Sequence, residues 1–500
     1  MTAETTSVPA AGLRDRVMRG LGWVAASQLL MQVSRAGVAV LLARLLTPEQ
    51  FGVAAIVLVF ASLVLVFSDL ALGAALVQAK TLTEADRSTA FWTTIAAGVV
   101  FCIAGVLLSG PIASLFGEPT VKPLCMALSG SFLITSIAVT HQSLLVREME
   151  FRRLETQTMV SVLIGGAVGV AVALAGKGSW AIIAQQLGTA VAASILLWVL
   201  SPWRPRFTFS TASLRQMSAF SLPLVGHRLL FYVHRNADNL LVARFVGTAA
   251  LGSYQLAYNL MLVPMSRIGG PLQRVFAPAF ARLQDDPERI AETWARLTRM
   301  VASIAIPSLM GLVVVAPDFV SVVLGHEWAQ IAPIVQLLAW VGMIQALQAI
   351  NVDILQARNR TSTILRYSIG FCGAHVIGFA IGVQWGVLGV AAAYAVTSLI
   401  VEPFLTVLTA RALGVSPWVF VRSVWGVFLC SLAMAAAVLA ARLAMLDNGI
   451  PALPRLLVCV AVGVVTFALV CAWRVPEVRL EYEALVRRLL ARRRRVMEVV

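Results

Sequence analysis

Long apolar runs dominate the pattern of this chain, and polar residues gather in short links between them. The runs show no alternation of polar and apolar residues with a period of two, which argues against the strands of a membrane barrel. Each run has about 20 residues or more, the length that a helix needs to cross a bilayer. The pattern predicts an all-α integral membrane protein with about fourteen transmembrane helices. The predicted spans are 20–43, 52–76, 88–110, 123–146, 157–176, 179–200, 219–244, 252–277, 297–317, 331–355, 364–383, 386–410, 419–442 and 453–473.

A second pattern is a repeat at a distance of roughly two hundred residues. Residues 35–52 run from an arginine through Leu-Ala-Arg to a glycine, and residues 235–252 follow the same order with Val-Ala-Arg. An even number of predicted spans separates the two copies, so both point the same way across the membrane. Such repeats are related by a pseudo-two-fold axis along the membrane normal, and they suggest a transporter with its site between the halves.

The repeat predicts two six-helix lobes and two unrepeated helices. Prolines and glycines mark matching helix ends, so the third span is expected to end near Pro111 and the ninth at Pro317. The last segment is rich in arginine and leucine, which predicts a basic amphipathic helix that serves as a topology anchor or docks a partner. The predicted parts are a cytoplasmic segment 1–19, lobes 20–200 and 219–410, a cytoplasmic linker 201–218, the added helices 411–473 and the tail 474–500.

Composition agrees with a membrane protein, because 59% of the residues are hydrophobic and only 13% are charged. The net charge of +15 comes from arginines that gather in every second link. This bias places both termini in the cytoplasm, so the charge is a topology signal and not a sign of nucleic-acid binding. The first nineteen residues are polar, and no cleavable signal peptide is expected. The six cysteines lie within predicted spans without a CxxC spacing, which is typical of small buried hydrophobes.

Charged and amide residues inside predicted spans are the candidate functional groups, because such residues are costly in a bilayer and usually face a cavity or a partner. The seventh span is the most polar and is expected to line water. An excess of arginine in a cavity suits a phosphate-bearing substrate, since the planar guanidinium can hold two oxygens at once. Structural ion pairing, for instance of Arg235 with Asp238, is the alternative. The candidate substrate-binding residues are Arg35, Arg228, Arg235, Arg267, Asn236 and Asn239.

Four acids are candidates for coupling or gating: Asp69, Asp238, Asp353 and Glu402. Each could bind a coupling ion, H+ or Na+, or form an ion pair that holds a gate or a lobe. His141 and His375 are each alone near small residues and are expected to be packing residues. The sequence contains no metal-ligand spacing, phosphate loop or nucleophile–base arrangement, so neither a further cofactor nor enzymatic activity is expected.

Several ordered strings carry a resemblance to a known family. Residues 42–52, LARLLTPEQFG, resemble the first-loop signature of the Wzx-type polysaccharide flippases of the multidrug/oligosaccharidyl-lipid/polysaccharide exporter superfamily. Residues 147–151, REMEF, fit the subgroup that serves exopolysaccharides such as colanic acid. One departure is Ala71, where the family tends to have glycine. Further matching strings are residues 69–78, 238–241, 251–258 and 276–280.

The resemblance implies two six-helix lobes around a cationic cavity, as in transporters of the MATE type. It implies that undecaprenyl-diphosphate-linked oligosaccharide moves from the cytoplasmic to the periplasmic leaflet of the bacterial inner membrane by alternating access. The product would serve exopolysaccharide, capsule or lipopolysaccharide O-antigen biosynthesis, with a polymerase and export proteins as partners. Arg35 corresponds by position to a cavity arginine of the related lipid II flippases. The last two helices would help to form a groove for the lipid tail.

Two other classes stay open from the sequence. A cation-coupled drug exporter of the same superfamily would favour acids in the cavity, whereas arginines dominate here. A membrane polysaccharide polymerase or glycosyltransferase would need a sizeable outer loop or interfacial acids, and the predicted outer loops are short.

Overall fold

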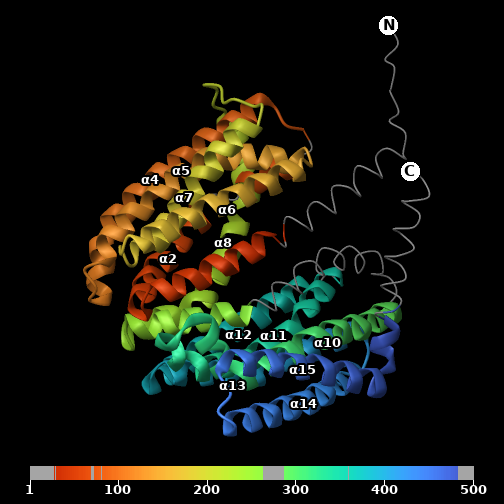
Figure 1. Cartoon of the computed structure of the whole chain (residues 1–500). Helices are drawn as coiled ribbons and strands as arrows, with labels where there is room; N and C mark the ends of the chain where they lie inside the picture. The colour runs from red at the N-terminus through yellow and green to blue at the C-terminus, as the bar shows by residue number, and fades with distance from the viewer. Residues whose placement is uncertain are drawn as a thin grey trace, which may run out of the picture. The chain divides into compact units, whose positions relative to one another are not determined.

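The computed structural model describes residues 28, 30–68, 72–79, 81–262, 287–358, 360–481 and 483, and every regular element among them is a helix (Figure 1). By packing, the chain divides into two units, with the boundary in the sequence after Gly252. The all-helical class is therefore as predicted. This boundary differs from the predicted one, which placed the linker between the lobes at residues 201–218. The predicted lobe limits therefore stay predictions.

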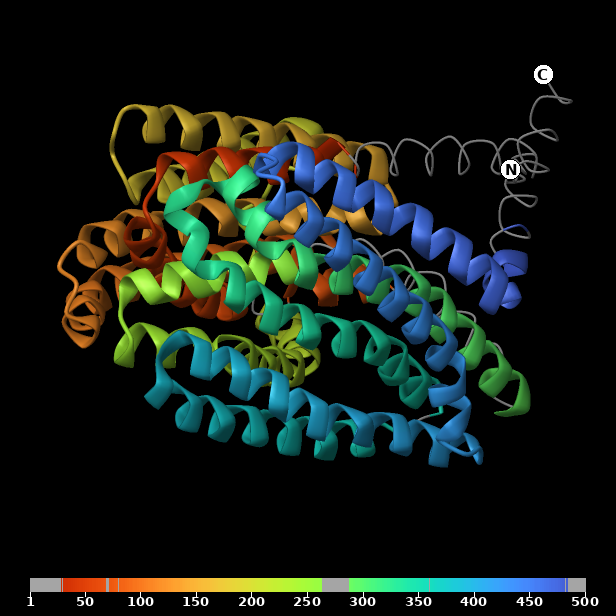
Figure 2. The ribbon, with the colours of Figure 1, turned by 60° about the horizontal axis from the view of Figure 1, so that its bottom comes forward.

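The first unit is a bundle of long antiparallel helices. Helices α4 and α5 form one close pair and α6 and α7 form another, and α5 also packs on α7 (Figures 1 and 2). The chain then continues into a helix over residues 248–262. The helices before it are residues 30–45, α2 (Pro48–Ser68), α3 (Leu72–Gln78), α4 (Glu84–Phe116), α5 (Val121–Arg147), α6 (Phe151–Leu174), α7 (Trp180–Leu200) and α8 (Thr211–Phe245).

Local capping explains why α4 is longer than the predicted span. Thr83 and Asp86 form a capping box at its start, where each side chain accepts a hydrogen bond from the other residue's backbone N–H. Gly117 ends the helix in the left-handed region at φ 65°. Pro111 lies inside the helix, so the predicted helix end near Pro111 is wrong. Membrane helices tolerate an internal proline because neighbouring groups can satisfy the carbonyl that loses its donor, which for Pro111 is the carbonyl of Leu107, four residues earlier.

The second unit is built around α10. Helices α11 and α14 both pack along α10, α14 also packs on α15, and α12 and α13 form a pair joined by a short 3-10 turn (Figure 2). Pro317 lies inside α10, so the predicted end there is also wrong, and the chain continues as a π-turn before it breaks at Gly325. The elements are α10 (Pro287–Phe319), η1 (Val320–Leu324), η2 (His326–Ile331), α11 (Ala332–Ala357), α12 (Thr361–Gly382), η3 (Val383–Trp385), α13 (Gly386–Leu413), α14 (Trp418–Asp447) and α15 (Ala452–Arg474).

Nine helical stretches within the described residues are long and apolar enough to cross a membrane. One of them, Ser362–Leu413, contains both α12 and α13. Many large apolar side chains face outward, as Leu107 and Ile377 do. A bilayer would cover such faces, so this is a multi-pass membrane protein. The count of about fourteen spans stays a prediction.

The two glycines of the sequence repeat lie at a reciprocal contact between two helix starts. A Cβ atom on Gly52 would lie 1.7 Å from the Thr248 carbonyl oxygen, and one on Gly252 would lie 1.9 Å from the Pro48 carbonyl oxygen. Each glycine thus lies against the first residue of the other helix, Gly52 against Thr248 and Gly252 against Pro48. This close approach leaves no room for a side chain, and it explains why glycine stands at the same place in both copies.

The segment after α15 packs onto the second unit. Val475 and Val478 are buried in the same hydrophobic cluster as α10, α14 and α15. Glu481 forms ion pairs with Arg296 at 3.5 Å and Arg299 at 3.9 Å. Burial raises the pKa of the Glu481 carboxyl, and the two guanidiniums oppose that shift. The first residues of the predicted tail therefore dock on α10, while residues 484–500 lie outside the described part of the chain.

Candidate functional site

A small polar pocket lies in the first unit between the helix of residues 30–45 and helices α5, α6 and α7. Its volume is about 270 Å³, and Arg35 supplies its charged lining group. This volume is just below the usual range for small-molecule sites, so the pocket suits one diphosphate or one sugar ring rather than a whole oligosaccharide. The polar lining residues are Arg35, Thr135, Gln142, Gln157, Thr158, Ser161, Thr189 and Ser194.

Two contacts on either side of Arg35 hold its helix against α6. Seven residues before Arg35, the Gln28 amide donates to the Glu155 carboxylate at 2.7 Å. One turn after Arg35, Val38 packs against Gly166, where an added Cβ would lie 2.8 Å from a Val38 methyl carbon. Residues at these spacings share one face of a helix. Arg35 is therefore placed on the face that meets α6.

The hydroxyl groups of the lining are directed by their own helices. Thr158, Ser161 and Thr189 each donate to the backbone carbonyl four residues earlier, at 2.8–2.9 Å. Their hydrogens are thus engaged, and their oxygens can act as acceptors, with one lone pair of Ser161 already used by the Gln157 amide at 3.2 Å. Sugar hydroxyl groups could donate to such oxygens.

Arg35 supplies the opposite chemistry. Its side chain is exposed to the pocket, and it forms no hydrogen bond or ion pair with any residue in the described part of the chain. A guanidinium has five N–H donors and no acceptor. The pocket thus combines one cationic donor with several neutral acceptors, which is an arrangement that can bind an anionic group next to a sugar.

Arg235, Asn236 and Asn239, three of the other predicted substrate residues, are not part of this pocket. On α8, Arg235 is exposed, and the Asn236 amide donates to the Tyr232 carbonyl at 2.9 Å. Asp238 and Asn239 are buried, and the Asn239 backbone N–H donates to the Asp238 carboxylate at 2.8 Å. The side chain of Arg228, and all of Arg267, lie outside the described residues.

Among the predicted coupling acids, Glu402 has the most distinctive surroundings. It is 4% exposed on α13 and lies against the Tyr367 hydroxyl of α12. Within the described residues, no arginine, lysine or histidine forms an ion pair with it. Asp353 on α11 is half-buried, and Asp69 lies outside the described residues.

Both lone histidines are packed among aromatic rings, as expected. His141 is fully buried on α5, next to Trp198 and Trp203 at ring distances of 4.6 and 5.3 Å. His375 is fully buried on α12 and lies 3.2 Å from the Ser398 hydroxyl, with the Phe371 ring 4.1 Å away and tilted by 46°.

Sequence reasoning missed one buried charge cluster. Asp318, near the end of α10, forms ion pairs with Arg442 of α14 and Arg455 of α15. Its carboxylate is 4% exposed, and the two arginines are 16% and 12% exposed. In the sequence, both arginines lie at the ends of predicted spans, 419–442 and 453–473, where charged residues are common. Their partner is more than a hundred positions away, so spacing alone could not reveal it.

Sequence reasoning also missed the polar residues around Arg35. The local signal was the i, i+4 pair of Gln157 and Ser161, which are linked by a 3.2 Å hydrogen bond on one face of α6. On α5, Thr135 and Gln142 are seven residues apart and therefore also share one face of their helix. These residues are neutral and looked like ordinary small-residue packing, and only the assembled bundle brings them to one pocket.

The long apolar helices define a multi-pass, all-helical membrane protein. The chain belongs to the polysaccharide biosynthesis protein family, which it matches over residues 41–333. This assignment agrees with the resemblance seen in the first-loop signature.

Curated relatives cover most of the chain. It is 28% identical over 428 residues to the lipopolysaccharide biosynthesis protein WzxC of Escherichia coli (strain K12), covering 84% of this chain and 86% of that protein. It is 28% identical over 425 residues to the teichuronic acid biosynthesis protein TuaB of Bacillus subtilis (strain 168), with coverage of 84% and 87%. It is 26% identical to the succinoglycan biosynthesis transport protein ExoT of Rhizobium meliloti (strain 1021), with 65% of each chain covered.

Solved structures share the fold. An inward closed conformation of the lipid II flippase MurJ aligns with a TM-score of 0.74 at 13% identity, covering 93% of this chain and 99% of that one. An inward-facing multidrug resistance MATE family transporter aligns with a TM-score of 0.60 at 12% identity, with coverage of 77% and 96%. At these identities the likeness concerns the fold.

Proposed function

We propose that this protein is a flippase that moves a polyprenyl-diphosphate-linked oligosaccharide from the cytoplasmic to the outer leaflet of a bacterial inner membrane. The observation that carries the proposal is the exposed Arg35 guanidinium, which is held in a polar pocket within a membrane-spanning bundle. A cation in such a place that has no counterion among the described residues is costly unless an anion visits it. The diphosphate of a lipid-linked sugar is an anion of this kind.

Membership of the polysaccharide biosynthesis family supports this substrate class, as do the roles for which the relatives WzxC, TuaB and ExoT are named. The neutral hydroxyls beside Arg35 support a role for the pocket in holding the first sugar next to the diphosphate. In this proposal the protein is a transporter rather than an enzyme, both termini are cytoplasmic, and exopolysaccharide, capsule or O-antigen synthesis consumes the product.

We further propose that Glu402 takes part in coupling, with H+ or Na+ as the ion. A buried carboxylate in a membrane helix needs a cation or a proton, and the described residues supply Glu402 with no ion-pair partner. Asp69, Asp238 and Asp353 remain alternative positions. Asp238 and Arg235, both on α8, each have an interaction partner, which suits a gate as well as a binding role.

The decisive experiment measures the leaflet location of lipid-linked repeat units in cells that lack this protein. The expected result is accumulation on the cytoplasmic leaflet and loss of surface polymer, with both reversed by the intact gene. If polymer synthesis continues and no intermediate accumulates, the flippase assignment is wrong. Efflux of cationic dyes would then test the exporter alternative.

A further inference from the structure

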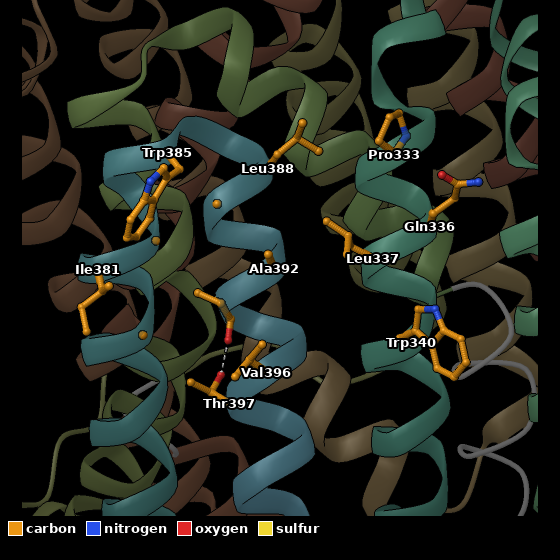
Figure 3. Close-up of a pocket in the computed structure, with 14 residues that line it drawn as sticks. Pro333, Gln336, Leu337, Trp340, Ile381, Trp385, Leu388, Ala392, Val396 and Thr397 are labelled. Carbon is orange, nitrogen blue, oxygen red and sulfur yellow. Dashed lines mark hydrogen bonds between the residues drawn. The ribbon is translucent and has the colours of Figure 1, made fainter.

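Helix α13 carries an apolar face and a polar face. On the apolar face, Leu388, Ala392 and Val396 line a groove of about 900 Å³ that α11 and α12 also border (Figure 3). Buried polar groups in a membrane bundle need partners or serve a function, so the opposite face has to be explained. That face is a buried stripe of polar residues three or four positions apart, a spacing that keeps side chains on one side of a helix. The stripe consists of Tyr394, Ser398, Glu402, Thr406 and Thr409.

On one side of Glu402 the stripe ends in an amide cluster. One turn after Glu402, the Thr406 hydroxyl oxygen accepts from the Gln348 amide of α11 at 3.0 Å. The Gln348 carbonyl oxygen in turn accepts from the Asn351 amide, and Asn351 accepts from the Trp294 indole of α10 at 2.8 Å. Amides and indoles donate or accept hydrogen bonds but do not exchange protons in the ordinary pH range. This cluster therefore closes the stripe to protons on that side.

On the other side of Glu402 the stripe meets an imidazole. The His375 Nδ1 atom lies 2.8 Å from the Phe371 carbonyl oxygen, which can only accept, so Nδ1 carries the hydrogen. Nε2 is then the acceptor, and the Ser398 hydroxyl donates to it at 3.2 Å. Both His375 and Ser398 are fully buried. The imidazole is thus in the tautomer that can take up a proton on the nitrogen next to Ser398.

Aromatic rings favour a charged imidazole at this place. Three ring centres lie 4.1, 5.2 and 5.9 Å from the centre of the imidazole, those of Phe371, Tyr394 and Phe379. A cation within about 6 Å of a ring centre is attracted by the ring. His141 of the first unit also lies among rings, but neither of its nitrogens has a hydrogen-bond partner in the described part of the chain. Of these two histidines, His375 is therefore the one arranged to pass a proton.

The surroundings of Glu402 hold no fixed cation in the part of the chain that the structure describes. Helices α10, α11 and α12 pack on α13, and from them the Tyr367 hydroxyl faces the carboxylate. Asp353 of α11 lies five positions after Gln348 and therefore on another side of that helix. The acids of α10 are exposed near its start or, in the case of Asp318, paired with arginines. A proton is thus the charge that can neutralise Glu402 here.

We propose that His375 passes protons to Glu402 through the Ser398 hydroxyl. This inference rests on the coupling role proposed for Glu402, and it assigns the proton as the coupling ion. Glu402 follows Ser398 by one helical turn, and long side chains on a helix point back towards the preceding turn. The carboxylate therefore reaches the Ser398 hydroxyl directly or through one water, as proton transfer requires.

The transfer moves one proton and leaves the serine unchanged. With a proton on Nε2, the imidazolium donates to the Ser398 oxygen while the hydrogen of Ser398 passes to the Glu402 carboxylate. The products are a neutral imidazole, an intact hydroxyl and a neutral carboxylic acid. His375 is fully buried and Glu402 is 4% exposed, so the proton is shielded from water at both ends. A coupled transporter needs such a shielded ion between its two open conformations.

The test follows the protonation of Glu402 by time-resolved infrared spectroscopy of the full-length protein in lipid vesicles, after light releases protons from a caged acid. The carboxyl C=O band that is absent in Glu402→Gln reports the neutral acid. We expect Ser398→Ala and His375→Gln to slow the appearance of this band about 100-fold or more, which is the usual contribution of a positioned proton-transfer group. The final size of the band should change little, because the acid itself is still present.

Ser431→Ala and His141→Gln are the matched controls. Ser431 is a fully buried serine of α14 whose hydroxyl donates to its own helix at 2.9 Å, and His141 is the buried histidine of the first unit. Both variants should protonate Glu402 at the parental rate. A parental rate in Ser398→Ala or in His375→Gln would overturn the relay and leave the coupling role of Glu402 intact.

Two further outcomes separate this inference from the proposals on which it rests. Suppression of the Glu402 band by added Na+ at constant pH would overturn the proton as the coupling ion. Absence of the band from the parent protein would overturn the relay together with the coupling role of Glu402. Failure of the flippase proposal would instead appear as normal polymer in cells that lack the protein, and the proton measurement, which needs no lipid-linked substrate, would be unaffected.

Discussion

Arg35 is the single residue on which the substrate proposal depends most directly. Replacing it by alanine removes a charge-assisted hydrogen bond to the diphosphate, so we expect apparent affinity in a proteoliposome flipping assay to fall about 10- to 100-fold. Arg35→Lys should retain part of the affinity, because an ammonium keeps the charge but loses the two-pronged geometry.

Arg422→Ala is the control for Arg35. Arg422 is equally exposed, lies on α14, and has no hydrogen bond or ion pair within the described residues. It should flip substrate at the parental rate. Equal affinity in the parent, Arg35→Ala and Arg422→Ala would remove Arg35 from the site.

Arg147 has a structural role. From the sequence, only its position at a helix end could be predicted. Its guanidinium donates to the Leu76, Val77 and Ala79 carbonyls at 2.8, 3.2 and 2.6 Å, which satisfies the last carbonyls of α3. Arg147→Ala should lower the free energy of unfolding by about 1–3 kcal/mol, and protease should cut faster in the link after α3. The exposed Arg153, whose pair with Glu150 spans 3.6 Å, should tolerate alanine with little effect. Equal proteolysis of the two variants would contradict this role.

Among the elements, α14 and α15 depend on the buried Asp318 cluster for their attachment to α10. Asp318→Asn leaves two mostly buried guanidiniums without a counterion, so we expect a loss of about 3–5 kcal/mol in the free energy of unfolding. Cys459 is buried between these helices, and its maleimide labelling should rise when they loosen. Asp447→Asn, at the exposed end of α14, should change neither measurement.

A second variant separates charge pairing from packing in that cluster. Replacing Asp318 by leucine together with Arg442→Met and Arg455→Met removes all three charges at once. Because apolar replacement of a whole buried ion cluster is often neutral, this triple variant should recover most of the stability lost in Asp318→Asn. A triple variant that unfolds as readily as Asp318→Asn would show that the helices need the charges themselves.

The starts of α2 and of the helix at residues 248–262 depend on two glycines. Gly52→Ala and Gly252→Ala should each lower the thermal unfolding temperature, because the new Cβ meets a backbone carbonyl that cannot turn away. Gly130 lies in α5 with nothing within 4 Å of an added Cβ, so Gly130→Ala should leave that temperature unchanged or slightly higher. Parental stability in Gly52→Ala would mean that the two helix starts do not meet as described.

At the scale of the whole molecule, the sequence predicted what is local or periodic. Helices α5, α7, α11, α13 and α15 begin and end within a few residues of the predicted spans, because apolar length and glycine stops determine both. Pro111 and Pro317 misled the prediction, since an internal proline in a membrane helix is compensated by its neighbours.

What the sequence could not predict depends on contacts between distant helices. Arg35 was identified because a charge in an apolar run is conspicuous, but Gln157, Thr189 and the other neutral groups around it were not. Asp318 and its arginines were missed for the same reason, since the pairing joins α10 to helices far along the chain. The position of a candidate charge is therefore readable from sequence, whereas its partners require the fold.

Coupling is a property of the whole molecule, and Glu402 provides a way to test it. A proton gradient can do work only if a group binds the ion on one side and releases it on the other, so that its occupancy biases the conformational equilibrium. Glu402→Gln resembles the protonated acid in shape but cannot release a proton. If H+ is the coupling ion, flipping in proteoliposomes should respond to an imposed pH gradient in the parent protein and not in Glu402→Gln.

An imposed Na+ gradient run in parallel identifies the ion, and Asp353→Asn serves as the comparison because Asp353 is a half-buried acid on α11. Glu402→Asp keeps an ionisable group and should retain part of the response. Were Glu402→Gln to respond like the parent while Asp353→Asn lost the response, the coupling role would belong to Asp353. The buried position of Glu402 beside Tyr367 would then serve helix packing between α12 and α13.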